Sequence, residues 1–152
     1  MSDEHDPATL ARAIIDANLY MVLGTADRSG RPWASPVYYA PKDYREFFWV
    51  SRPETTHSQN LAERDELGIV IFDSSVPIST GRGVYMSASA REFTGEERME
   101  GIDVFSRRSL AHGGREWTLA DVEASARLRL YRAVAVEQYV LGADDRRMPV
   151  TL

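Results

Sequence analysis

The stretch that decides the fold is Phe-Phe-Trp-Val-Ser-Arg-Pro-Glu-Thr-Thr-His-Ser-Gln-Asn, residues 47–60. It begins as an apolar run of β-type residues, Phe47 to Val50. After Pro53 it changes to a segment that starts with two threonines, where Ser or Thr favours a helix start. The stretch therefore predicts a strand that leads, through a short turn, into a helix opening at Thr55 or Thr56.

Such a helix start is suited to an anion. The first amides of a helix have no intrahelical partner and carry partial positive charge. A phosphate placed there would accept these amides, the hydroxyls of Thr55, Thr56 and Ser58, and the cationic side chain of Arg52, with His57 as a further donor. The alternative is an ordinary N-cap with no ligand, because Ser and Thr are favoured there for backbone reasons alone.

Upstream of this stretch the pattern predicts one helix and a hairpin. Asp6 and Pro7 form a helix start, with a capping residue followed by Pro at the first helical position. Residues 20–25 and 33–40 are rich in strand formers and flank the turn at 27–30. We expect these two strands to pair antiparallel.

Downstream, further strands and helices alternate with loops. The apolar run 67–72 predicts a strand buried on both faces, and 84–93 alternates as a half-solvated strand does. Thr118 and Asp121 form a capping box for the second of two expected helices. The remaining expected elements are helices at 96–111 and 119–128, the strands 46–51 and 130–141, and a polar tail at 144–147.

Short hairpin connections without crossover helices favour an antiparallel barrel. We predict a mainly β (α+β) fold, a six-stranded antiparallel split β-barrel with flanking helices. The 152 residues fit one domain, and residues 1–5 and 143–152 are expected to be peripheral tails.

Composition excludes several classes of protein. The chain has no cysteine, so thiolate metal sites and Cys nucleophiles are absent, and its three histidines lie far apart, so we expect no metal site. A net charge of −5 argues against nucleic-acid binding, and no apolar segment approaches the length of a membrane helix. The acidic start lacks the pattern of a signal peptide, so we expect a cytoplasmic protein.

Pro36 either interrupts the strand 33–40 or places it at a sheet edge, because proline cannot donate to a strand ladder. An unpaired edge there, next to the strand 46–51, could hydrogen-bond a planar heterocycle. Alternatively, Pro36 marks a barrel corner. The two interpretations are compatible, since ligands commonly bind where a barrel opens.

Together these motifs resemble the pyridoxamine 5′-phosphate oxidase-like family of FMN-binding split β-barrels. The matching segments, in order, are residues 23–37, 48–52, 56–61, 70–74 and 83–90. Such proteins form homodimers with FMN in a cleft between subunits. The resemblance implies an isoalloxazine ring against the backbone of Ser35, Pro36, Val37, Val50 and Ser51. It implies a phosphate near Arg52, Thr56, His57, Ser58 and Asn60.

One position departs from the family pattern. Many relatives carry Lys or Arg where His57 stands, and the only lysine in this chain is Lys42. Phosphate affinity should therefore depend more on Arg52 and the helix amides. The C-terminal substrate-binding pattern of true pyridoxamine phosphate oxidases is not evident, so vitamin B6 chemistry is not assigned.

The resemblance implies an FMN-dependent oxidoreductase that acts on an unidentified small organic substrate. In this class the cofactor supplies the chemistry, so the absence of a catalytic dyad is no obstacle, and no catalytic residue is assigned. Three alternatives remain: a non-catalytic carrier or sensor of flavin, haem or another planar ligand, a deazaflavin-dependent reductase on the same fold, and a dimer whose cleft has lost its ligand.

Overall fold

Eight strands of one sheet form most of the computed structural model, which describes residues 6–142 and 144–152. Three α-helices and one 3₁₀ turn accompany them. In chain order, the elements are α1 (Pro7–Ala17), β1 (Tyr20–Ala26), β2 (Pro32–Tyr38), β3 (Ala40–Lys42), β4 (Glu46–Ser51), α2 (Thr56–Glu63), β5 (Glu66–Phe72), β6 (Gly83–Glu92), α3 (Arg98–Ala111), η2 (Leu119–Val122), β7 (Arg129–Leu141) and β8 (Arg147–Pro149).

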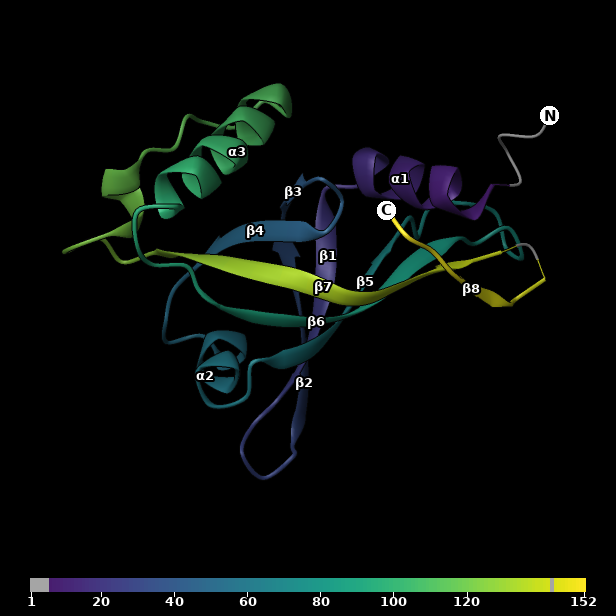
Figure 1. Cartoon of the computed structure of the whole chain (residues 1–152), viewed down its shortest axis with the longest axis horizontal. Coiled ribbons are helices and arrows are strands. Elements are labelled where there is room, and N and C mark those ends of the chain that lie inside the picture. The colour runs from purple at the N-terminus through teal and green to yellow at the C-terminus, as the bar shows by residue number, and fades with distance from the viewer. Residues whose placement is uncertain (1–5, 143) are drawn as a thin grey trace.

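The strand order is β2-β1-β5-β6-β7-β4-β3, with β8 on β7, and every neighbouring pair is antiparallel. The sheet curls into a half-barrel, with α1 and α3 above the strands and α2 below β6 and β7 in the view of Figure 1. The predicted fold, an antiparallel split barrel with flanking helices, is confirmed.

The strand count differs from six, because two short strands lie in segments that have no strand pattern. β3 covers residues 40–42, which end with the first residue of the turn expected at 42–45, and it pairs with β4. β8 falls in the segment expected to be a polar tail, and Val150 and Leu152 pack against the core beyond it. The C-terminal segment is therefore part of the sheet. Residues 1–5, also expected to be a tail, lie outside the described residues.

The buried apolar residues form two clusters, a large one between the sheet and α1 and a smaller one in which α3 packs against Phe48 and Leu130. Trp49 and Phe47 of β4 and Met21 and Leu23 of β1 are fully buried in the large cluster. The prediction that residues 67–72 are buried on both faces is wrong. Leu67, Ile69 and Ile71 point into the core, whereas Phe72 on the opposite face is 47% exposed. An apolar run does not distinguish a buried face from an apolar face left open to a partner.

Three helix predictions agree with the structure and one does not. The Asp6 carboxylate accepts the Thr9 amide and caps α1, and α2 and α3 lie where they were expected. The predicted helix at 119–128 is only the 3₁₀ turn η2. Its capping box forms, but Glu123 is already extended, with a φ of −138° and a ψ of 173°, so the turn stops at Val122, and Ala124 follows with a left-handed φ of 53°. Within the described residues, no helix is both long and apolar enough to span a membrane.

Candidate ligand-binding groove

The curled sheet is open between β2 and β4. In the part of the chain that the structure describes, β2 pairs only with β1, and the end of β4 beyond Phe48 pairs only with β7. The backbone edges of both strands are therefore unpaired where they approach the opening, and unpaired backbone groups need a partner.

Both edges line one groove of about 400 Å³. Pro36 and Val37 contribute from β2, and Val50 and Ser51 from β4. The other lining residues are Tyr20, Tyr38, His57, Phe105, Ser109, Trp117 and Leu128. The lining is thus largely apolar and aromatic, with a few polar groups, as is typical of small-molecule sites.

The structure brings together half of the ten residues predicted to hold a cofactor. Pro36, Val37, Val50, Ser51 and His57 all line the groove. The other five do not line it. Ser35 lies on β2 beside the groove, and Arg52 lines an adjoining hollow. Thr56 and Asn60 line a hollow of about 620 Å³ next to the β1–β2 turn. Ser58 lines a separate cavity.

Ser58 and Asn60 hold α2 to its surroundings. The side-chain amide of Asn60 donates to Thr25 Oγ1 of β1 at 3.0 Å, with both residues buried. Thr55 is the N-cap, because its hydroxyl accepts the Ser58 amide at 3.2 Å and lies 2.7 Å from the Ser58 hydroxyl. In this structure these side chains are used within the protein, which fits the ordinary N-cap interpretation for Thr55.

His57 is a buried neutral group. Its Nε2 lies 2.9 Å from the hydroxyl of Ser51, and its side chain is 7% exposed. Burial lowers the pKa of His57 below its usual value, since desolvation disfavours the imidazolium. At pH 7 the ring therefore supplies a hydrogen-bonding group to the groove and no positive charge.

The positive charge lies in a hollow of about 520 Å³ that Arg52, Glu54, Thr55 and Arg127 line. This hollow adjoins the groove, because Ser51 and Leu128, the chain neighbours of Arg52 and Arg127, line the groove itself. Sequence reasoning missed Arg127, since it is one arginine among 17 in a loop with no motif.

Sequence reasoning also missed the far wall of the groove, which α3 and the segment after it build. The rings of Phe105 and Trp117 pack edge to face at 5.4 Å, and the Ser109 hydroxyl donates to the carbonyl of Arg115 at 2.8 Å. At the rim, the hydroxyl of Tyr38 lies 2.7 Å from Nδ1 of His112. Aromatic residues in a helix and a loop gave no signal that separates a ligand wall from core packing.

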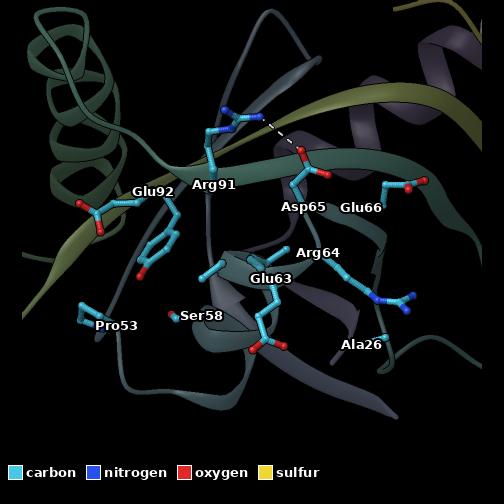
Figure 2. Close-up of a pocket in the computed structure, with 12 residues that line it drawn as sticks. Ala26, Pro53, Ser58, Glu63, Arg64, Asp65, Glu66, Arg91 and Glu92 are labelled. Carbon is cyan, nitrogen blue, oxygen red and sulfur yellow. Dashed lines mark hydrogen bonds and ion pairs between the residues drawn. The ribbon is translucent and has the colours of Figure 1, made fainter. Parts of the chain in front are cut away.

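A larger cavity of about 970 Å³ lies beside α2, bordered by β6 and β7 (Figure 2). Charged residues dominate its labelled lining, and Asp65 and Arg91 point toward each other as an ion pair at 3.3 Å. Glu63, Arg64, Glu66 and Glu92 also line it. It contains one of the ten predicted residues, Ser58.

A half-barrel with a groove between two free strand edges defines the split β-barrel class. The family model for pyridoxamine 5′-phosphate oxidase matches residues 9–139, and the chain belongs to this family. No curated protein matches the chain.

Solved structures share this fold. The heme-binding protein of Mycobacterium smegmatis has a TM-score of 0.74 and 18% identity over 92% of this chain, which spans 55% of that protein. The heme storage protein HutZ of Vibrio cholerae has a TM-score of 0.65 and 16% identity over 82% of this chain and 86% of its own. An FAD-binding protein of Mesorhizobium loti has a TM-score of 0.67 and 16% identity over 88% of this chain and 92% of its own. At these identities the likeness is one of fold.

Proposed function

We propose that the chain is an FMN-dependent oxidoreductase that works as a homodimer on a small organic substrate. One observation supports this above the others. An apolar groove between two free strand edges adjoins, along residues 51–52 and 127–128, a hollow lined by two guanidinium groups. A planar ring that carries a phosphate on a short chain has this same division into an apolar and an anionic end.

The groove fits the ring of a flavin in its chemistry. Free backbone N–H and C=O groups of β2 and β4 are available to the polar edge of the ring, and Pro36, Val37 and Val50 offer apolar contact. The hydroxyl of Ser51, paired with His57, is a further partner for the polar edge. Ser35 would act through its backbone, from its place on β2 beside the groove.

The hollow fits the phosphate. Arg52 and Arg127 would supply charge-assisted hydrogen bonds, and the first amides of α2, at Thr56 and His57, would add partial positive charge. Arg127 would thus replace the cation that many relatives carry at the position of His57. Ser58 and Asn60 would support the site by fixing α2 rather than by touching the phosphate.

The homodimer is supported by an apolar outer face. Directly paired residues of a sheet point to the same side, so Val22, Pro36 and Val70 share one face across β2, β1 and β5. Tyr20 and Phe72, 60% and 47% exposed, continue it. Exposed apolar patches of this kind mark protein interfaces. Because Tyr20 and Pro36 also line the groove, a second copy on this face would cover the groove and complete a site between subunits.

Bound flavin would supply the hydride and electron transfer, while the protein orients the ring, excludes water and hydrogen-bonds its edge. A deazaflavin cofactor would require a longer basic groove for its anionic tail, and Glu54 within the hollow works against that.

A haem carrier is the second candidate. Two of the similar structures are described as heme-binding or heme storage proteins. In this chain the observation that favours haem is the exposed imidazole of His112 at the groove rim. His57 is a poorer iron ligand, because its Nε2 is engaged with Ser51.

The absorption spectrum of the purified protein, before and after incubation with FMN or haemin, tests the proposal. We expect the two-band spectrum of oxidised flavin after incubation with FMN and removal of free ligand. A Soret band that forms with haemin, with no flavin retained, would replace the proposed function by the haem carrier.

A further inference from the structure

The rim of the groove carries a pair of side chains that a flavin-binding role does not require. Tyr38 lines the groove, and its hydroxyl lies 2.7 Å from Nδ1 of His112, at the end of α3. The rings meet edge to face at 5.9 Å. The contact thus joins a residue of the groove to an imidazole that is exposed to solvent.

The pair is held in place from both sides. The amide of His112 donates to the carbonyls of Arg108 and Ser109, each at 3.1 Å, and Gly113, with a φ of 80°, ends the helix directly afterwards. The ring of Tyr38 packs edge to face on Tyr20 at 6.1 Å and on Phe105 at 5.6 Å. Because these contacts fix the positions of both side chains, the hydrogen bond between them is preorganised.

The surroundings shift the protonation of both groups. Burial raises the pKa of the Tyr38 phenol, with an opposing influence from the Arg108 guanidinium and a supporting one from Tyr20. Slight desolvation of the largely exposed ring, together with the Arg108 charge, lowers the pKa of His112. Arg108 and Tyr20 are the titratable groups that act on this pair. Tyr38 therefore keeps its proton at neutral pH, and the imidazolium form of His112, which is populated at lower pH, is a stronger acid than usual and can pass its proton to Tyr38.

We propose that Tyr38 is a catalytic proton donor of the groove and that His112 resupplies it. The inference depends on the proposed function and deepens it by naming a substrate class: carbonyl or quinone acceptors, which need a proton on oxygen as they gain hydride. A bound reduced flavin would supply both electrons with the hydride. The acceptor oxygen takes the proton of the Tyr38 hydroxyl, Tyr38 takes the Nδ1 proton of His112, and His112 is reprotonated by solvent. One proton enters from water for each hydride transferred.

The test measures how fast the FMN-loaded protein, first reduced by dithionite in the absence of oxygen, reduces each of two acceptors. 1,4-Naphthoquinone needs a proton with its electrons, whereas ferricyanide takes one electron and no proton. We expect Tyr38→Phe to slow naphthoquinone reduction by about 100-fold, the scale of general acid catalysis, with ferricyanide reduction unchanged. The wild-type rate with naphthoquinone should fall as the pH rises through the pKa of His112, and His112→Gln should remove this dependence.

Tyr44→Phe is the matched control. The Tyr44 hydroxyl also makes one side-chain hydrogen bond, to Asp16 at 2.9 Å, but Tyr44 does not line the groove. The variant should leave both rates unchanged. A readout without flavin is the titration of His112 by NMR in the flavin-free protein, where Tyr38→Phe should shift the pKa of His112. Wild-type naphthoquinone rates in Tyr38→Phe, equal slowing with both acceptors, or an unshifted His112 would each overturn the inference. If the wild type retains no flavin, the proposed function fails as well, and the spectrum separates the two failures.

Discussion

The groove between β2 and β4 is less than half as large as the cavity of Figure 2, about 400 against about 970 Å³, yet the groove has the features of a ligand site. The cavity is lined mainly by charged side chains, of which Asp65 pairs with Arg91, Glu63 accepts the Arg28 amide and Arg64 donates to the Arg28 carbonyl. The groove is lined by unpaired strand edges and apolar rings, next to guanidinium groups that line a hollow of their own. The two therefore differ in the chemistry of their lining, apolar and aromatic in the groove and charged in the cavity, and this difference favours the smaller of them.

Filling the groove should produce the largest effect. Val50 lines it and is only half-buried, so Val50→Trp would occupy the space of the ring with little cost to the fold. We expect FMN affinity to fall by about 100-fold or more, about 2.8 kcal/mol of binding free energy, as measured by calorimetric titration.

Ala62→Trp is the control in the larger cavity, where Ala62 is exposed. It should leave FMN affinity unchanged, with melting temperatures of both variants confirming that they fold. If Ala62→Trp abolished binding and Val50→Trp did not, the roles of the two hollows would be reversed.

Removal of either guanidinium from the hollow should weaken FMN binding less than filling the groove. A charge-assisted hydrogen bond contributes roughly 1.5–3 kcal/mol, so Arg52→Ala and Arg127→Ala should each lower FMN affinity by about ten-fold or more. Riboflavin, which lacks the phosphate, should bind both variants as it binds the wild type. Equal losses for riboflavin and FMN would show that these arginines act on the fold and not on the phosphate.

The buried His57 should make stability depend on pH. Its pKa is lowered in the folded protein, so below about pH 6.5 the unfolded chain binds a proton that the folded chain does not. Stability should therefore decline as the pH falls from 6.5 through the folded pKa of His57. His57→Gln should flatten the dependence of melting temperature on pH between 7.5 and 5. His112→Gln, at an exposed position, should change it less, and an equally large change would contradict the burial argument.

The smallest effect is expected in the large cavity. The Asp65–Arg91 pair is 47% and 76% exposed, and exposed ion pairs contribute about 0–1 kcal/mol. Arg91→Ala should change the free energy of unfolding, measured in urea, by no more than this and should leave FMN binding intact. Loss of FMN binding in this variant would give the cavity a role that we do not assign to it.

Much of the fold could be predicted from the sequence, because local signals and the final structure agree. The strand 46–51 has the predicted bounds and the Thr55 cap forms, and Asp6 starts α1 as its side chain suggests. The errors arise where partners outside the segment decide the structure. The apolar outer face of residues 67–72 resembles a core, so burial on both faces was predicted wrongly. The helix predicted at 119–128 stops at Val122, because Glu123 is extended although the capping box at Thr118 forms.

The site was predictable in part for the same reason. Pro36 marks a free strand edge by its own chemistry, and the groove forms at that edge. Half of the predicted residues line it. Arg127 and His112 reach the site through the path of the chain after α3, and no local pattern encodes that path. Ser58 and Asn60 carry the polar side chains of a ligand site, but here they make hydrogen bonds within the fold.

A crystal structure of the protein with FMN tests the central claim most directly. We predict the isoalloxazine ring against Pro36, Val37, Val50 and Ser51, with the phosphate within hydrogen-bonding distance of Arg52 and Arg127. FMN bound in the cavity of Figure 2, or crystals grown in saturating FMN with no flavin in the groove, would contradict it.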